Sequence, residues 1–241
     1  MAVTKIRLCV DQPLGVGQTV PLTREQAHYL FGVMRLAVGD QLYVFNGRDS
    51  EFRASVVVAG KRGGVLDCVE ETRTLQMPPD LWLLFAPIKK ARTDFIVEKA
   101  TEMGVARIIP VRTDYTNSER LRRDKLQAHV IEAAEQCGGT FVPEVAELEK
   151  LDKLLGSWPE DRQLMYCDES RIEEAATLSD LTPGPWAILI GPEGGFSPAE
   201  RARLSESRFT TSVSLGPRIL RADTAAVAAL TMWQMALGDW R

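Results

Sequence analysis

The spacing of apolar residues divides the chain into two parts with different periods. Up to about residue 72, apolar and polar residues mostly alternate in short runs, a period of two that predicts β-strands. An interlude over 23–36 has helical spacing, and Thr23 followed by Gln26 is a capping-box pattern that predicts its start. Asn46-Gly47 stands between two β-patterned runs and predicts a hairpin. The first part is therefore expected to be a small β-barrel.

Beyond residue 76 the pattern changes to continuous apolar runs that alternate with helical segments. Such an alternation predicts an α/β domain whose sheet is mostly parallel and covered on both faces. The paired prolines of 74–80 resist both helix and strand pairing, so they mark the linker. We expect one domain over 1–72 and a second over 77–241. The second should contain strands at 81–86, 107–111, 141–145, 164–167, 186–190 and 211–215, and helices at 92–103, 125–137, 147–155, 198–206 and 224–237.

Composition predicts the cellular compartment and argues against disulfides and a metal site. With 45% apolar and 26% charged residues, the chain is typical of a soluble globular protein. No apolar run is long enough to span a bilayer and the first residues lack a signal-peptide pattern, so a cytoplasmic protein without membrane contact is expected. Four scattered cysteines and two histidines have no ligand spacing, so neither disulfides nor a metal site is predicted.

A glycine-rich turn follows the apolar run 186–190 and leads into a helix. Ser197, Pro198 and Glu200 have the spacing of a capping box with proline in the first turn, which predicts the helix start. Glycine amides at this turn could approach a ligand closely. Glu193 in the middle of the turn would repel a phosphate, and no phosphate-loop signature is present. The expected ligand is therefore polar but not polyanionic.

A second corner, GPRILRAD over 216–223, has the same strand-turn-helix construction. Its helix is expected to be capped by Asp223 or Thr224. Two such corners side by side, with apolar walls, would suit a flat heteroaromatic ring with a ribose and an amino-acid tail, and S-adenosylmethionine fits that description. The residues expected to bind this cofactor are Ile190, Gly191, Glu193, Gly194, Gly195, Leu215, Gly216, Ile219, Leu220 and Thr224.

These two corners carry a family resemblance. IGPEGGFS and SLGPRILRADTAAVAAL are similar to the loops of the 16S rRNA (uracil-N3)-methyltransferases of the SPOUT superfamily, and VEKATEMGVARIIPV, AAEQCGG and AHYLFGVMRLAVGDQLYVFNG extend the similarity over most of the chain. The resemblance implies a PUA-like amino-terminal barrel that helps to hold RNA and a SPOUT α/β domain with a trefoil knot. It also implies a homodimer that methylates N3 of a uridine in 16S rRNA, within the small ribosomal subunit.

The proposed reaction assigns roles to three residues of the second corner. Uracil N3 becomes nucleophilic as its proton leaves, so a cation near O2 and O4 would favour the anion. Arg221 is the first candidate for that role and Arg218 the second, although either could clamp phosphate or form a surface ion pair. Asp223 stands where the family commonly has glutamate; it either handles a proton or caps the helix. Glu193 either hydrogen-bonds the cofactor or orders its loop by accepting backbone amides.

Cations elsewhere point to RNA or to a solvated surface. From Lys89 to Lys125 ten Lys or Arg stand against six Asp or Glu, although the whole chain carries a net charge of −4. Arg35 resembles the family's RNA-facing arginine. The expected RNA contacts are Arg35, Lys89, Lys90, Arg92, Arg120, Arg122 and Arg123.

Two other functions remain open from the sequence. A non-catalytic RNA-binding or assembly protein would keep the barrel but not the glycine loops, and a related knotted enzyme would methylate the ribose 2′-oxygen of tRNA or rRNA. The intact loops and the RILR stretch favour a methyltransferase that acts on a base nitrogen.

Overall fold

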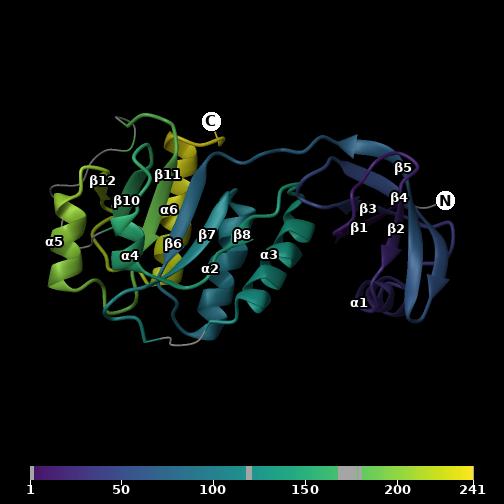
Figure 1. Cartoon of the computed structure of the whole chain (residues 1–241), viewed down its shortest axis with the longest axis horizontal. Helices are drawn as coiled ribbons and strands as arrows, with labels where there is room; N and C mark the ends of the chain where they lie inside the picture. The colour runs from purple at the N-terminus through teal and green to yellow at the C-terminus, as the bar shows by residue number, and fades with distance from the viewer. Residues whose placement is uncertain (1–2, 118–120, 168–177, 179–180, 241) are drawn as a thin grey trace. The chain divides into compact units, whose positions relative to one another are not determined.

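The computed structural model describes residues 3–117, 121–167, 178 and 181–240 of the chain (Figure 1). The chain forms two compact units. The first comprises Met1–Met77 together with Ala134–Val142, and the second comprises Pro78–Ala133 and Pro143–Arg241. The periodicity of the sequence did not predict that 134–142 would group with the first unit.

The first unit is a five-stranded sheet with a helical segment. Its strands run in the order β1-β3-β4-β5-β2, with β1 and β3 parallel and the other pairs antiparallel. The β3–β4 hairpin confirms the turn expected at Asn46-Gly47, where Gly47 has φ +73°. The elements are β1 (Val3–Cys9), β2 (Thr19–Leu22), α1 (Arg24–Ala27), η1 (His28–Val33), β3 (Gln41–Phe45), β4 (Glu51–Gly60) and β5 (Gly63–Arg73).

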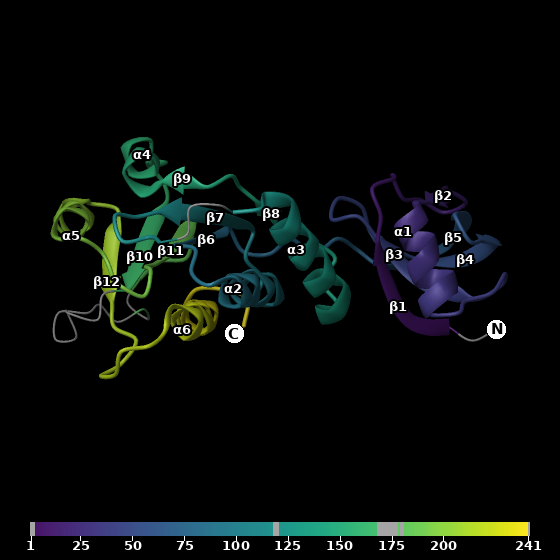
Figure 2. The same cartoon turned by 90° about the horizontal axis from the view of Figure 1, so that it is seen from below.

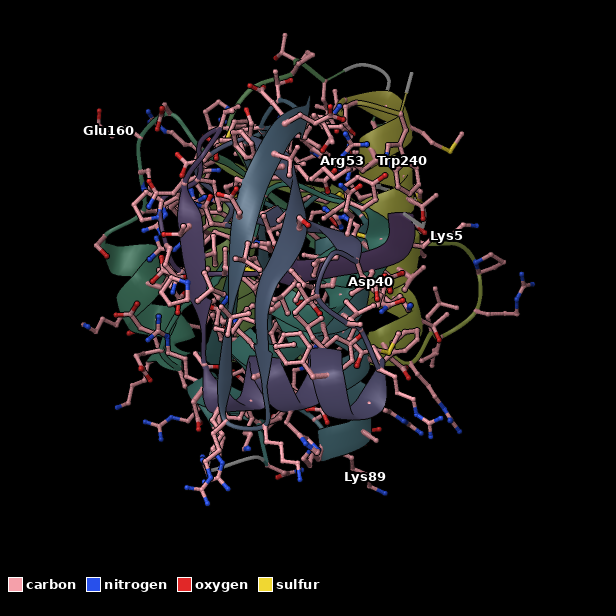
Figure 3. The ribbon with its side chains drawn as sticks, turned by 90° about the vertical axis from the view of Figure 1, so that its right-hand side faces the viewer. Lys5, Asp40, Arg53, Lys89, Glu160 and Trp240 are labelled. Atoms are coloured by element: carbon pink, nitrogen blue, oxygen red, sulfur yellow. The ribbon has the colours of Figure 1, made fainter. Side chains whose placement is uncertain are left out.

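The helical segment of the first unit begins and ends as local chemistry dictates. The capping box predicted at Thr23 is present, because its side chain accepts from the Gln26 amide and the Gln26 side chain accepts from the Thr23 amide. The second half, η1, is a π-helix, which the apolar spacing could not distinguish from an α-helix. Arg35 follows it with φ 59°, the left-handed conformation that usually falls to glycine after a helix. In Figure 3 this segment lies across one end of the strands.

A buried ion cluster joins the strands of the first unit to its segment 134–142. Glu51, whose side chain is 3% exposed, accepts hydrogen bonds from Arg7 and Arg73. Burial alone would raise the pKa of the Glu51 carboxyl, but the hydrogen bonds from Arg73 and Arg7 outweigh it, so the pKa is lowered. The same arginines donate to carbonyl groups at and just after the end of helix α3 (Arg123–Cys137): Arg7 to Ala134 and Gly139, and Arg73 to Gly138.

The second unit confirms the expected α/β architecture with a parallel sheet. All of its strand pairs are parallel, in the order β12-β10-β11-β6-β7-β8, and β9 also pairs with β7. The elements are β6 (Leu81–Phe85), α2 (Lys90–Glu102), β7 (Arg107–Arg112), α3 (Arg123–Cys137), β8 (Glu144–Val145), β9 (Glu149–Lys150), α4 (Leu151–Gly156), β10 (Gln163–Cys167), β11 (Trp186–Ile190), α5 (Pro198–Glu206), β12 (Thr210–Val213) and α6 (Ala222–Ala236).

Helices cover both faces of this sheet. In Figure 2, α2 and α6 lie on one face and α4 and α5 on the other. Leu164 and Leu189 of the strands pack with Leu151 of α4 and Leu204 of α5 in one buried cluster. Because successive strand residues point to opposite faces, neighbours such as Ile188 are buried beneath α2 and α6. Burial on both faces explains why these strands read as continuous apolar runs.

The amino ends of three strands are held together by one arginine. Arg162, just before β10, donates two hydrogen bonds to the carboxylate of Asp80 and one to the carbonyl of Trp186. Its guanidinium carbon lies 3.6 Å from the ring centroid of Trp82, and its side chain is 7% exposed. This contact fixes the starts of β6, β10 and β11 relative to one another.

Two expected helices differ from the structure. The helix expected over 147–155 is shorter, because Glu149–Lys150 pairs with β7 as strand β9 and the helix α4 begins only at Leu151. The last helix begins at Ala222 rather than after Asp223 or Thr224. Among the helices in the described part of the chain, none combines the length and the apolar character that crossing a bilayer requires.

Candidate active site at the carboxyl end of the parallel sheet

The carboxyl ends of three adjacent strands bring both glycine corners together. Strand β10 lies between β11 and β12, and the first corner follows β11 while the second follows β12. In such sheets ligands bind outside the carboxyl ends of strands. The loop that joins β12 to α6 is visible in Figure 2. The two corners therefore meet where the fold favours a ligand.

The first corner is built on a rigid helix start. The Ser197 side chain accepts from the Glu200 amide and Glu200 accepts from the Ser197 amide, which confirms the predicted capping box. Ser197 Oγ also donates to Asp114 of the loop after β7, over 2.6 Å. A Cβ at Gly191 would lie 2.6 Å from the Phe196 ring, so glycine is required there, and Gly195 has φ +69°.

The second corner differs at its helix start from what the sequence predicted. The expected cap at Asp223 or Thr224 is wrong, because the N-cap is Arg221, whose carbonyl accepts from the Ala225 amide. Asp223 lies in the first turn of α6, where a carboxylate is favoured by the helix dipole, and it accepts from the Thr224 amide. Gly216 has φ +103°, a conformation that side chains rarely adopt.

A cavity of about 360 Å³ lies between the corners, within the size range of small-molecule sites. The structure brings ten of the predicted site residues to it: Ile190, Gly191, Glu193, Gly195, Leu215, Gly216, Arg218, Ile219, Leu220 and Arg221. It leaves Gly194, Asp223 and Thr224 outside the lining. Gly194 instead faces Tyr115, whose Cβ would be 3.5 Å from a Cβ at that glycine.

The sequence reasoning missed several residues that line the cavity, among them Tyr166, Cys167, Phe196 and Arg201. Tyr166 and Cys167 end β10, so the rule that ligands bind at carboxyl ends of strands could have found them once β10 was placed between the corners. Burial raises the pKa of the Cys167 thiol to about 12, so this thiol is protonated at neutral pH and is not a nucleophile. Arg201, in α5, had no signal in the sequence.

Glu193 has a partner that neither sequence interpretation anticipated. Its Oε1 accepts from Nη1 of Arg92 in α2 over 2.7 Å, so among the contacts described its carboxylate bonds a side chain rather than backbone amides. The Nε atom of Arg92 also lies 3.8 Å from Oδ2 of Asp223. Arg92, predicted to contact RNA phosphate, thus stands between an acid of the first corner and one of the second.

The two arginines of the second corner are in a different situation. Arg218 and Arg221 are exposed, and within the described residues their side chains have no ion pair or hydrogen bond. Their charges face the cavity, and no residue in the described part of the chain is their counter-ion. They are therefore available to an anionic or polarised ligand group.

The remaining predicted RNA contacts lie outside the cavity. Lys89 and Lys90 are exposed at the start of α2, and Figure 3 shows Lys89 projecting away from the protein. Arg122 pairs with Asp124 and lowers the pKa of that carboxyl to about 2. Arg123 donates to the carbonyl of Val145. Arg35 is exposed in the first unit, and Arg120 lies outside the described residues.

The cavity suits the cofactor expected from the sequence. Glycine backbone at both corners and apolar walls fit a molecule with an aromatic ring and polar edges, and the carboxylate of Glu193 in the lining is paired with Arg92. Among the described residues, no group of three or more His, Cys, Asp or Glu side chains could hold a metal ion. Glycine corners and apolar walls at the carboxyl ends of parallel strands suit an organic, nucleotide-like ligand.

Fold and site together define an α/β enzyme that binds a nucleotide-like cofactor, and comparison with known proteins narrows this class. An RNA methyltransferase domain model matches residues 76–234, and an RNA methyltransferase PUA domain model matches 22–66, which confirms the expected PUA-like first part. The chain is 31% identical to ribosomal RNA small subunit methyltransferase E of Rickettsia conorii, over 93% of this chain and 93% of that protein. It belongs to this methyltransferase E family of RNA methyltransferases.

Two solved structures are similar over nearly the whole chain. Ribosomal RNA small subunit methyltransferase E from Neisseria gonorrhoeae, bound to S-adenosyl methionine, has a TM-score of 0.89 and 28% identity, covering 98% of this chain and 99% of that one. A methyltransferase structure from Legionella pneumophila, in complex with the bound cofactor SAM, has a TM-score of 0.87 and 31% identity, covering 98% of this chain and all of that one.

Proposed function

We propose that this chain transfers a methyl group from S-adenosylmethionine to N3 of a uridine in 16S ribosomal RNA. The observation that carries the proposal is the cavity between the two glycine corners, which is lined by backbone and apolar groups and by Arg218 and Arg221, for which no described residue is a counter-ion. Methyl transfer to small-subunit rRNA is the activity named for the relatives in Rickettsia and Neisseria. The choice of uridine N3 rests on the family resemblance and on the arginines.

The cofactor, when bound, supplies an electrophilic methyl group on a sulfonium. This chain's residues have two tasks, which are to align the donor and acceptor and to stabilise the charge that develops on the base. Alignment can lower a barrier by about 7–11 kcal/mol at best. The guanidinium of Arg221 is assigned to O2 and O4 of the uracil, where negative charge spreads as the N3 proton leaves. Arg218 either assists Arg221 at the uracil oxygens or binds the phosphate next to the target base.

The base must leave any duplex before reaction, because N3 lies on its Watson–Crick edge. Lys89, Lys90, Arg122 and Arg123 in the second unit, with Arg35 in the first, are assigned to the RNA backbone. Their exposure supports this assignment.

We further propose a cytoplasmic homodimer with a knotted second domain. The exposed apolar side chains of Met232, Met235 and Trp240, on and just after α6, support self-association. Sedimentation of the purified protein tests the dimer, and a monomer at micromolar concentration contradicts it.

One experiment tests the reaction directly. Small-subunit particles and free 16S rRNA from a strain that lacks this protein are incubated with the protein and isotopically labelled S-adenosylmethionine, and the RNA is digested to nucleosides for mass spectrometry. The label is expected on a uridine base, in N3-methyluridine. A label on the ribose contradicts the base assignment, and an absence of labelled nucleoside despite cofactor binding contradicts methyl transfer.

A further inference from the structure

Helix α2 begins with a charge pattern that works against its own stability. Lys89 is the N-cap, Lys90 and Arg92 follow in the first turn, and that turn has no acidic residue. Cations at the positive end of a helix dipole are unfavourable. A local rule broken in this way commonly marks a functional position. The three cations differ, however, in what they contact.

Arg92 is the one cation of this turn that reaches the two glycine corners. It hydrogen-bonds Glu193 over 2.7 Å and lies 3.8 Å from Asp223. Glu193 is 101 residues away in the sequence, in the loop after β11, and Asp223 lies in the first turn of α6. Lys90, by contrast, pairs with Asp94 of its own helix, and Lys89 projects away from the protein.

The partial burial of Arg92 and its acidic neighbours argue against a contact with RNA phosphate. Its side chain is 27% exposed, whereas that of Lys90 is 80% exposed. Arg92 does not line the cavity, but its partner Glu193 does, and Asp223 is two residues from Arg221. A phosphate at Arg92 would approach two carboxylates, which would repel it.

We propose that Arg92 is a positioning residue for methyl transfer, which holds Glu193 at the cavity and Asp223 at the start of α6, and that it is not a phosphate contact. This inference rests on the proposed function and deepens it. Arg92 acts through two acids: Glu193 lines the cofactor cavity, and Asp223 lies in the first turn of α6, two residues after Arg221. The planar fork of arginine can serve two carboxylates at once, which the point charge of lysine does less well.

A phosphate contact and a positioning residue predict different results when RNA affinity is measured over a range of salt concentrations. Removing a phosphate contact lowers the salt slope of the affinity by about one unit, whereas removing a positioning residue leaves the slope unchanged. Lys89→Ala is the benchmark for loss of a phosphate contact. Lys99→Ala, on the same helix and in contact with Glu102 and Phe95 of that helix, is the control for a change that touches neither site.

For Arg92→Ala we expect the salt slope of the wild type, together with at least a roughly tenfold lower single-turnover rate of methyl transfer at saturating RNA and cofactor. Arg92→Lys is expected to keep RNA affinity and still lose most of the rate. Glu193→Gln, which keeps the shape of the side chain, should lower the rate in the same direction. In the double variant Arg92→Ala/Glu193→Gln the two losses should not add, because each single change breaks the same contact.

Several outcomes overturn the inference. A salt slope that falls by about one in Arg92→Ala, with or without a loss of rate, identifies a phosphate contact. A wild-type rate in that variant, or additive losses in the double variant, also overturns the positioning role. If Arg92→Ala unfolds, Arg92→Lys and Glu193→Gln decide alone. If the wild-type protein transfers no methyl group, the proposed function is contradicted instead. In that case cofactor affinity is measured for Arg92→Ala, Glu193→Gln and the double variant, and these affinities decide the role of Arg92.

Discussion

The two ends of the parallel sheet use the same side chain in opposite ways. At the amino end, Arg162 is almost fully buried, donates hydrogen bonds to the carboxylate of Asp80 and stacks on the ring of Trp82. At the carboxyl end, Arg218 and Arg221 are exposed, and no described residue is their counter-ion. An arginine whose two terminal nitrogens bond a carboxylate and carbonyl groups can hold strands together but has little to offer a ligand. An arginine without a partner adds little to the fold and keeps its charge for a substrate.

The largest effect that follows from this comparison is on the reaction. Arg221→Ala should lower the rate of methyl transfer by about 100- to 1000-fold, the cost typical of removing one group that stabilises developing charge. Cofactor affinity should stay within a few-fold, and the melting temperature should hardly change because the side chain is exposed and pairs with none of the described residues. Rate, calorimetric binding and thermal unfolding are measured on the same preparation.

Arg218→Ala is the matched variant on the same turn. A smaller loss of rate is expected, since Arg218 is the second candidate. If cofactor affinity falls as much as the rate in Arg221→Ala, then Arg221 holds the cofactor and the role assigned to it at the base is wrong.

The second prediction concerns the opposite end of the sheet. Arg162→Ala should lower the free energy of unfolding by about 2–3 kcal/mol, because it removes several hydrogen bonds, including the one to the carbonyl of Trp186. Asp80 is half exposed, so its stranded charge adds less than a buried one would. Denaturant unfolding measures the change. Cofactor affinity at temperatures well below unfolding should match that of the wild type.

Arg162→Met retains the apolar stem on Trp82 and separates packing from polar contacts. Its stability should lie between those of the wild type and Arg162→Ala. Equal stability of all three proteins contradicts the view that this arginine fixes the amino ends of the strands.

How far the sequence predicted these two ends follows from the range of each interaction. The capping box of Ser197 and Glu200 and the two glycine corners are local, so their spacing in the sequence revealed them. The contact between Arg92 and Glu193 joins positions 101 apart, and no period in the sequence relates them. The amino-end contact of Arg162 with Asp80, 82 residues away, was equally hidden.

The errors at helix ends have a related cause. The last helix begins at Ala222 because the Arg221 carbonyl accepts the first helical hydrogen bond, although Asp223 and Thr224 are the residue types that usually cap. The short strand at Glu149–Lys150 pairs with β7, so tertiary contact overrides the helical spacing of that stretch. The family resemblance supplied the activity, which periodicity could not.

A third arginine site extends the comparison to the first unit. Glu51 is buried between Arg7 and Arg73, and its pKa is lowered, so its charge should stabilise the fold as Arg162 does. Glu51→Gln should cost about 1–3 kcal/mol at neutral pH, because a buried charged hydrogen-bond network is broken. Urea unfolding at a series of pH values measures this.

The sign of the pH dependence follows from the lowered pKa. In the unfolded chain this carboxyl titrates near its ordinary value of 4.5, and in the folded protein below it. The contribution of Glu51 is therefore fully present above pH 4.5 and is lost as the pH falls through the folded-state pKa. The stability gap between wild type and Glu51→Gln should close toward low pH. A gap that does not depend on pH contradicts the view that the charge of Glu51 carries the effect.

The smallest expected effect is at Arg35, where stability and RNA binding should change in opposite directions. Arg35 has φ 59°, where glycine is favoured, and it is exposed. Arg35→Gly should raise the free energy of unfolding by about 0.5–1 kcal/mol, since the backbone strain is relieved. It should also weaken binding to 16S rRNA and lower the salt slope by about one, since a phosphate contact is lost. Arg35→Ala removes the same charge but keeps the Cβ, so it should lose RNA affinity without the gain in stability. If Arg35→Gly binds RNA as the wild type does, the arginine is not retained at a strained position for RNA, and the distinction between engaged and available arginines does not extend to the first unit.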